Sequence, residues 1–213
     1  EYAARRRKLI DPEKALRLAA PGQAEHRDTV YLTVVDGQGS AVSFISSLYY
    51  SFGSGLVVPG TGICLQNRGA CFTLEEGHPN VLAGGKRPYH TIIPAMALRD
   101  GALWLSFGVM GGFMQPQGHV QVLSNMLDYG MDAQTALDAP RFRVDERGGP
   151  EVSLEGGVPT ETCKALEEMS HNLRIEPALG SGFGGGQIIA VHADTGVLEG
   201  GSDPRKDGCA VGF

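Results

Sequence analysis

The chain has 213 residues, of which 42% are hydrophobic and 20% are charged, and its formal net charge is −6. These values are typical of one globular domain, and the negative charge argues against a nucleic-acid-binding surface. No apolar run is long enough to span a bilayer, and the charged first residues do not resemble a signal peptide, so no membrane partner is expected. The compartment stays open between cytoplasm and periplasm.

Glycine, cysteine and histidine narrow the class further. The 31 glycines cluster between well-patterned segments, which predicts tight turns and close approach of the backbone to a ligand. The four cysteines have no C-x-x-C spacing and are too few for a disulfide scaffold, so buried free thiols are expected. The six histidines have no metal-ligand spacing, and we therefore expect no catalytic metal and no cofactor.

The first half of the chain predicts one helix and two hairpins. Residues 1–20 have helical spacing, and residues 24–28 read as a polar linker. Residues 29–35 and 41–46 are rich in β-branched and aromatic side chains and flank a glycine-rich turn, which predicts a hairpin. Residues 91–98 and 102–107 predict a second hairpin, whose consecutive apolar residues indicate strands covered on both faces.

The second half predicts three helices and a strand. Helices are expected at residues 118–129, 132–139 and 161–171, the first closed by Gly130 and the second N-capped by Asp132. The last strand is expected at residues 187–192. Helices and antiparallel hairpins segregate in blocks, so the predicted class is α+β with layered sheets. Few helices are available to cover these strands, which indicates that another polypeptide completes the core.

A hydroxyl nucleophile needs a nearby base and donors that face the oxyanion. A threonine at the N-terminus of a chain can use its own α-amine as the base, because the reference pKa of that amine is about 7.7–8.0. His26 lies close to Thr29, so composition leaves a Ser/His/Asp triad open, although no G-x-S-x-G elbow occurs. Spacing alone does not single out Thr29, since most threonines in strands are structural.

Residues 28–36, with the sequence DTVYLTVVD, resemble the start of the small subunit of gamma-glutamyltransferases. Further matching blocks follow in family order at residues 52–55, 59–63, 86–88, 110–112, 139–142 and 201–205. This family belongs to the N-terminal-nucleophile hydrolases, and its proenzyme cleaves itself directly before the matching threonine. The ordered blocks cover about the whole chain, which makes the resemblance specific.

The resemblance implies a fold and a division of the chain. The expected fold is the four-layer αββα sandwich of N-terminal-nucleophile hydrolases, incomplete without a large subunit. Residues 1–28 would be a pre-cleavage helix and linker at the end of the large-subunit region. Residues 29–213 would be the catalytic small-subunit domain, which pairs with the large subunit of the same precursor as a heterodimer or heterotetramer.

The resemblance also implies catalytic roles. Thr29 would be the nucleophile for self-cleavage, between Asp28 and Thr29, and for substrate turnover. Ser47 stands where the family has a threonine that hydrogen-bonds the nucleophile; the alternative is an ordinary solvent-facing serine of a strand. Gly111 and Gly112 would supply the N–H groups of the oxyanion hole, and the alternative is a plain turn from strand to helix.

Several positions depart from the typical family pattern. Tyr49 replaces an asparagine that contacts substrate, and Arg68 and Cys71 replace a glutamine and an aspartate. That aspartate binds the α-ammonium of a glutamyl group, which a thiol cannot do through a charge-assisted bond. His90 and Thr91 replace two serines near the oxyanion hole. These departures argue against a standard gamma-glutamyl substrate.

The set at residues 28–30, 66–69, 90–91 and 110–112 is similar to a divergent branch that includes oxamate amidohydrolase. Arg68 either pairs with a substrate carboxylate or bonds loop carbonyls, and His90 is either a polar pocket wall or a satisfied core histidine. Tyr49 and Thr91 are the other expected substrate contacts. The expected function is a gamma-glutamyltransferase-like amidohydrolase or acyl transferase that works through an acyl-threonine on a small-molecule amide or gamma-glutamyl substrate. The alternatives are an oxamate-type or other small-amide hydrolase, and a non-catalytic scaffold.

Overall fold

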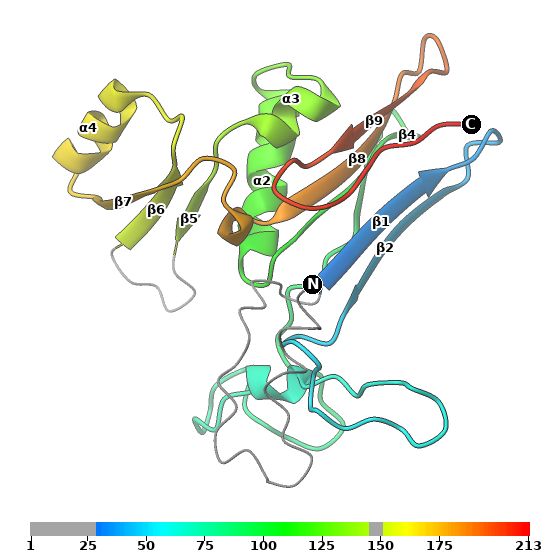
Figure 1. Ribbon diagram of the computed structural model, residues 1–213, viewed down its shortest axis with the longest axis vertical. Coiled ribbons are helices and arrows are strands. Elements are labelled where there is room, and N and C mark those ends of the chain that lie inside the picture. Colours follow the sequence, from blue (N-terminus) through cyan, green and yellow to red (C-terminus); the bar gives the residue numbers. More distant parts are fainter. Residues whose placement is uncertain (1–28, 145–150) are drawn as a thin grey trace, which may run out of the picture.

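The computed structural model describes residues 29–144 and 151–213, which form a mixed α/β fold of three sheets and a few helices (Figure 1). The helix expected at residues 1–20 and the linker at 24–28 lie outside the described residues. Within the described residues, no helix is both long and apolar enough to cross a membrane. All four cysteines are free thiols, but the expectation that they are buried is wrong: three are partly buried and Cys209 is exposed.

The first predicted hairpin is confirmed. Strands β1 (Thr29–Val35) and β2 (Ala41–Ser47) pair antiparallel. The Asp36 carboxylate closes the turn by accepting the N–H groups of Gln38 and Ser40, both at 2.8 Å. Because side chains alternate along a strand, the hairpin has two distinct faces. Its outer face carries five apolar side chains that are 47–62% exposed: Val30, Leu32, Val34, Val42 and Phe44.

The central sheet is antiparallel and has the order β3-β4-β8-β9. Its strands are β3 (Ala95–Arg99), β4 (Ala102–Met110), β8 (Gly185–Val191) and β9 (Leu198–Ser202). Strand β4 is buried on both faces from Leu105 to Val109, as predicted. The edge strand β3 is not, since Met96 and Leu98 are exposed. It also begins at residue 95 rather than 91, directly after Pro94, which has no N–H to give to a ladder. Strand β9 was not predicted.

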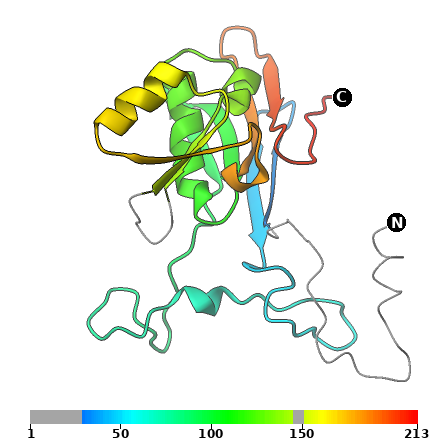
Figure 2. The same cartoon turned by 60° about the vertical axis from the view of Figure 1, so that its left-hand side comes forward.

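The elements stack in three layers (Figures 1 and 2). Helices α2 (Met114–Leu127) and α3 (Ala133–Asp138) cover one face of the central sheet, and the β1-β2 hairpin packs against the other face. The core between helices and sheet is made by apolar side chains from both: Leu105, Phe107, Val109, Val122, Leu137 and Ile188. Asp132 caps α3 as predicted, since its side chain accepts the Thr135 N–H.

Helix α2 begins four residues earlier than predicted, at Met114. Pro116 lies in the first turn of this helix, where a missing N–H costs no hydrogen bond. The earlier start matters for function, because the added turn is the one that reaches the end of β4.

The face of the hairpin that meets the central sheet is partly polar. Thr33 Oγ1 donates a 2.6 Å hydrogen bond to Ser106 Oγ, and the Tyr31 ring lies over Gly108, where a Cβ atom would come within 2.5 Å of it. The outer face, by contrast, is apolar and exposed. This distribution is the reverse of that in an antiparallel sheet whose outer face meets water.

A small lobe lies beside the helices (Figure 2). It contains β5 (Phe142–Val144), β6 (Glu151–Glu155) and β7 (Asn172–Glu176), and α4 (Thr160–Glu168) connects the parallel strands β6 and β7. The three strands were not predicted, and α4 ends three residues before the predicted end. A buried cluster of two arginines and two carboxylates ties the lobe to β9, with ion pairs Arg141–Asp203 at 2.6 Å and Arg205–Glu155 at 2.5 Å. Removing one member of such a cluster leaves a buried charge unpaired.

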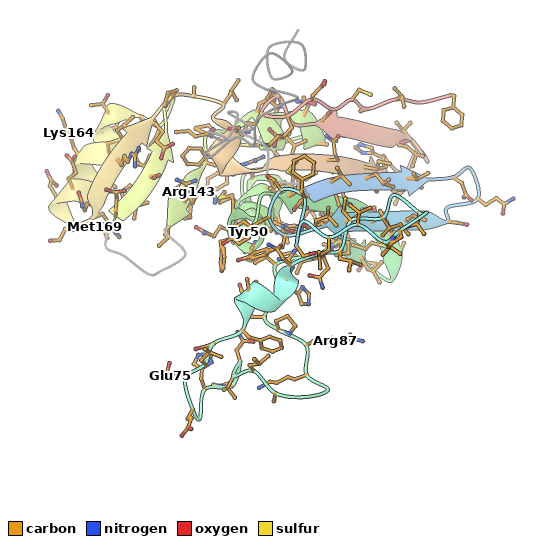
Figure 3. All side chains as sticks on the ribbon, turned by 60° about the horizontal axis from the view of Figure 1, so that its bottom comes forward. Tyr50, Glu75, Arg87, Arg143, Lys164 and Met169 are labelled. Atoms are coloured by element: carbon orange, nitrogen blue, oxygen red, sulfur yellow. The ribbon has the colours of Figure 1, made fainter. Side chains whose placement is uncertain are left out.

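Residues 48–94 project from the layered body, and Glu75 and Arg87 lie on this projection (Figure 3). The segment has only turns, isolated bridges and the short 3-10 helix η1 (Arg68–Cys71). A second 3-10 turn, η2 (Ser181–Phe183), precedes β8. Arg68 is the buried residue of η1. At this point the projecting segment lies close to the end of the hairpin, since the Arg68 guanidinium contacts the Tyr49 ring.

Candidate active site

Thr29 and Ser47 are direct partners in the hairpin register, at its open end. Thr29 is only 3% exposed, and its Oγ1 donates a 2.9 Å hydrogen bond to Ser47 Oγ. Ser47 Oγ also accepts the backbone N–H of Tyr49 at 3.0 Å. Ser47 therefore faces Thr29 rather than solvent, and one hydroxyl fixes both the Thr29 side chain and the start of the next segment.

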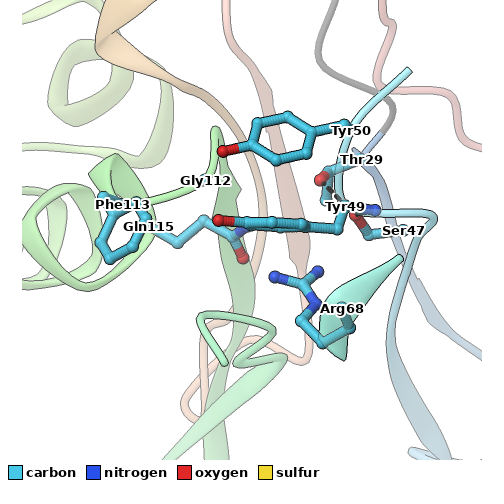
Figure 4. Close-up of a pocket in the computed structure, with 8 residues that line it drawn as sticks. All are labelled: Thr29, Ser47, Tyr49, Tyr50, Arg68, Gly112, Phe113 and Gln115. Carbon is cyan, nitrogen blue, oxygen red and sulfur yellow. Dashed lines mark hydrogen bonds between the residues drawn. The ribbon is translucent and has the colours of Figure 1, made fainter. Parts of the chain in front are cut away.

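The segment after β2 places two tyrosines and an arginine against one another, with the two rings tilted by 48° (Figure 4). The Tyr49 and Tyr50 rings lie 4.3 Å apart between centroids, and the Arg68 guanidinium lies 4.5 Å from the Tyr49 ring centroid. Tyr49 has a φ of 79°, a left-handed conformation that is a genuine outlier for a bulky residue and that often marks a functional site. Burial raises the pKa of the Tyr49 phenol above its ordinary value, so this hydroxyl stays protonated at neutral pH.

Arg68 is 9% exposed. Within residues 29–144 and 151–213, no carboxylate forms an ion pair with its guanidinium. A buried guanidinium is costly unless an anion or a ring of acceptors meets it. Stacking on Tyr49 compensates part of that cost and leaves the charge available to a ligand.

Gly111 and Gly112 form the turn between β4 and α2. Their φ values of 141° and 63° are accessible to glycine at little steric cost. At Gly111 a Cβ atom would come within 2.9 Å of the Gly184 Cα, so the turn is packed directly against the segment before β8. The glycines are thus required by the turn itself, and Gly112 also lines the pocket described next.

These elements enclose one pocket (Figure 4). Its lining comes from the hairpin end, the projecting segment and the start of α2: Thr29, Ser47, Tyr49, Tyr50, Arg68, Gly112, Phe113 and Gln115. No histidine, aspartate or glutamate among the described residues lines it. The arrangement offers a hydroxyl nucleophile, a cation and backbone N–H groups, but no side-chain base.

The structure brings together some predicted site residues and separates others. Thr29, Ser47, Tyr49, Arg68 and Gly112 meet at the pocket. His90 and Thr91 do not line it: His90 is exposed, and Thr91 is buried. The predicted cleavage residue Asp28 and the alternative base His26 lie outside the described residues.

Three pocket residues were missed from the sequence: Tyr50, Phe113 and Gln115. Tyr50 and Phe113 lie directly beside Tyr49 and Gly112, which were singled out, whereas no local pattern marks Gln115. Gln115 is completely buried. With its carboxamide assigned so that donors meet acceptors, the nitrogen donates to the Thr91 carbonyl at 2.5 Å and the oxygen accepts the Gly112 N–H at 3.3 Å. The buried residue Thr91 does not line the pocket, but its backbone carbonyl contacts the pocket residue Gln115.

Comparison with known proteins identifies relatives over the whole chain. The family model described as gamma-glutamyltranspeptidase matches residues 1–213. The chain is 40% identical over 206 residues to the glutathione hydrolase-like YwrD proenzyme of Bacillus subtilis, covering 93% of this chain and 38% of that protein. It is also 40% identical over 190 residues to the oxamate amidohydrolase proenzyme of Klebsiella pneumoniae, covering 87% of this chain and 36% of that protein.

Solved structures have the same fold. The cephalosporin acylase of Bacillus halodurans matches with a TM-score of 0.79 and 48% identity, over 97% of this chain and 37% of that one. The gamma-glutamyltranspeptidase of Pseudomonas nitroreducens complexed with L-DON matches with a TM-score of 0.75 and 27% identity, over 86% of this chain and 98% of that one. The chain therefore spans well under half of the curated relatives that it matches.

Proposed function

Because the chain belongs to the gamma-glutamyltranspeptidase family, we propose that it is the catalytic part of an amide hydrolase or acyl transferase whose nucleophile is Thr29. The Asp28–Thr29 peptide bond would be cut in the proenzyme, which frees the Thr29 α-amine. Residues 1–28 would then end the large-subunit region, and residues 29–213 would form the catalytic domain.

One observation carries this proposal. The Thr29 hydroxyl meets a pocket and is held by Ser47, while no side-chain base among the described residues lines that pocket. A hydroxyl needs a base to become a nucleophile. The Thr29 α-amine is attached to the same residue, and with a reference pKa of about 7.7–8.0 it is partly neutral at physiological pH.

The reaction follows from these groups. Thr29 Oγ1 attacks the substrate amide carbonyl as the α-amine takes the hydroxyl proton, and the resulting oxyanion accepts N–H groups from the Gly111-Gly112 turn. The C–N bond then breaks, and the leaving amine takes the proton from the Thr29 ammonium. Water or an acceptor amine attacks the acyl-Thr29 ester, which releases the acid or a new amide and restores the hydroxyl.

Arg68 supports a substrate whose acyl group carries a carboxylate. Its guanidinium is buried at the pocket, lacks a carboxylate partner among the described residues, and is suited to bidentate binding of a carboxylate. Tyr49 would hold the guanidinium in place by stacking. Oxamate, which carries a carboxylate directly beside its amide carbonyl, fits this chemistry, and an oxamate-type amide hydrolase is therefore the favoured second candidate. The exposed side chain of His90 is not included among the proposed substrate contacts.

The proposed partner is a large subunit from the same precursor, in a heterodimer or heterotetramer. It would complete a fourth layer by covering the apolar outer face of the β1-β2 hairpin. The relatives' own chains are more than twice as long as the matched part, which leaves ample sequence for such a layer. The P. nitroreducens chain, matched almost completely by 86% of this chain, supports a unit that begins near Thr29.

Thr29→Ala in the full-length protein tests the proposal, with turnover of oxamate and of a gamma-glutamyl anilide as the readouts. We expect loss of turnover and, by mass spectrometry, loss of the cut before residue 29. Thr33→Ala is the matched control, because Thr33 lies on the same face of β1 but bonds Ser106 outside the pocket. If Thr29→Ala leaves turnover intact, Thr29 is not the nucleophile; if the parent turns over neither compound and stays uncut, the non-catalytic scaffold is the better description.

A further inference from the structure

Gln115 is a pocket residue whose side chain reaches back to Gly112 in the proposed oxyanion turn, three residues earlier in the chain. It lies in the first turn of α2, is completely buried, and lines the pocket together with Thr29 and Gly112 (Figure 4). Its carboxamide bridges two segments once its nitrogen and oxygen are assigned so that donors meet acceptors: the nitrogen then donates to the Thr91 carbonyl at 2.5 Å, and the oxygen accepts the Gly112 N–H at 3.3 Å.

The orientation of the Gly112 N–H group depends on its hydrogen-bond partners. Its φ is 63°, and the peptide plane that carries its N–H is held in the turn by a long backbone bond, from the Met114 N–H to the Gly111 carbonyl at 3.3 Å. Gln115 adds a further contact to the same plane, since its side-chain oxygen, in the assigned orientation, accepts the Gly112 N–H; its backbone N–H also donates to the Gly112 carbonyl at 3.0 Å in the next plane. The Gly112 N–H is thereby held toward a side chain of the pocket wall.

The contact from Gly112 N–H to Gln115 is long, at 3.3 Å, and its acceptor is neutral. A bond from the same N–H to an oxyanion is charge-assisted and roughly twice as strong, so a developing oxyanion can replace the carboxamide oxygen. The nitrogen end of the carboxamide keeps its bond to Thr91 during this exchange. Gln115 can therefore orient the Gly112 N–H and still release it to the oxyanion.

We infer that Gln115 is the positioning residue of the oxyanion turn, holding the Gly112 N–H toward the pocket until the substrate oxygen takes it over. The inference rests on the proposed function, since it presupposes an oxyanion at Gly112. It also gives the Thr91 segment a role, because the Thr91 carbonyl anchors the other end of the carboxamide.

Gln115→Leu in the full-length protein removes both bonds and keeps a similar volume. We expect kcat for the substrate that the parent turns over to fall about 10–100-fold, with KM within threefold, because loss of one oxyanion donor costs on the order of 100-fold or more. Gln121→Leu is the matched control: it removes a carboxamide from the same helix, bonded to Phe142 N and O at 2.9 and 3.0 Å, outside the pocket. Its kcat should stay within twofold of the parent value.

Gln115→Glu adds a readout that a purely structural role would not give. The carboxylate accepts the Gly112 N–H more strongly and repels an oxyanion, whereas the protonated acid restores one donor and one neutral acceptor. The ratio of its kcat to that of the parent should therefore rise as pH falls, while its KM stays near the parent value.

A kcat for Gln115→Leu within twofold of the parent, or above it, would overturn the inference, and the second result would mean that the carboxamide merely blocks Gly112. An equal loss in Gln121→Leu, or a flat pH ratio for Gln115→Glu, would overturn it as well. If Thr29→Ala abolishes turnover while Gln115→Leu does not change it, the positioning role fails alone. If the parent turns over no panel compound, the proposed function fails and the inference fails with it.

Discussion

Thr29 Oγ1 donates to Ser47 Oγ at 2.9 Å because the two residues face each other across the open end of the β1-β2 hairpin. The same Ser47 oxygen accepts the Tyr49 N–H at 3.0 Å, and Tyr49 has the unfavourable φ of 79°. One hydroxyl thus couples the proposed nucleophile to a strained aromatic residue of the pocket wall. The hairpin register places Thr29 opposite Ser47, and Tyr49 follows two residues after Ser47 along the chain.

Ser47→Ala should lower kcat about 10–100-fold, because it leaves the Thr29 hydroxyl and the Tyr49 N–H without their acceptor, and an unpaired buried group costs about 1–3 kcal/mol. Steady-state kinetics on the substrate of the parent protein measure this. Ser47→Thr keeps the hydroxyl and should retain most of the activity. Ser43→Ala, which removes the 2.7 Å partner of the Tyr31 hydroxyl on the same strand but outside the pocket, should leave kcat unchanged. Equal kcat values for Ser47→Ala and Ser43→Ala would contradict the role of Ser47.

Arg68→Met should lower kcat/KM for oxamate about 10–100-fold, because a hydrogen bond to a charged group contributes about 1.5–3 kcal/mol. The neutral amide oxamide has no carboxylate and should lose little. The ratio of the two kcat/KM values is the measurement, since it cancels general damage to the site. Arg99→Met is the control, because Arg99 stacks on Trp104 at 4.0 Å on the edge hairpin. A parallel loss for both compounds would mean that Arg68 is a structural arginine.

Gly184→Ala should disturb the oxyanion turn. Gly184 has a φ of 81°, and a Cβ atom there would come within 2.7 Å of the Met110 carbonyl oxygen, directly before Gly111. Gly196 has a similar φ of 70°, but a Cβ atom there meets nothing within 4 Å. Gly196→Ala should therefore cost only the backbone strain, about 1 kcal/mol. Gly184→Ala should cost roughly 1–3 kcal/mol more in urea unfolding and also lower kcat. Equal losses in both variants would show that the turn tolerates the added methyl group.

The sequence was most informative where a local pattern decides the structure. The hairpin at residues 29–47 and the Asp132 cap follow from β-branched runs, turn residues and capping chemistry. The β5-β6-β7 lobe was missed because its strands are short and its β6-β7 pairing is parallel and non-local. The first turn of α2 was missed because the helical spacing of apolar residues, from Val120 to Leu127, starts only beyond that turn. Gln115 lies in that turn and was therefore missed as well, since no local pattern marks it as a pocket residue.

Some residues of the candidate site could be predicted from the sequence and others could not. Thr29, Ser47 and the Gly111-Gly112 pair were singled out by the resemblance to gamma-glutamyltransferases, since spacing alone does not mark them; the hairpin register then explains why Thr29 and Ser47 meet. The side chain of His90 could not be placed, since its position depends on the path of the projecting segment rather than on any periodic pattern. The fate of the Thr29 α-amine depends on cleavage, which a fold does not determine.

His119 should make stability depend on pH in a predictable direction. Burial lowers its pKa below the ordinary value, and its Nδ1 lies 2.7 Å from the Gln115 carbonyl, which suits a neutral ring that donates there. The unfolded chain binds a proton at a pKa near 6.5 and the folded chain at a lower pKa, so the contribution of His119 to stability falls as pH drops below about 6.5 and is fully present above it. His119→Gln should remove this component.

Urea unfolding at pH 7.5 and 5.5 measures this component: the loss of unfolding free energy on acidification should be larger in the parent than in His119→Gln by on the order of 1 kcal/mol. The exposed His171 gives the control His171→Gln, which should keep the parent's pH dependence. If His119→Gln loses as much stability on acidification as the parent, His119 is not the source of the pH dependence. The buried ring then takes up its proton without unfolding, and water reaches it despite its contact with the Phe107 ring.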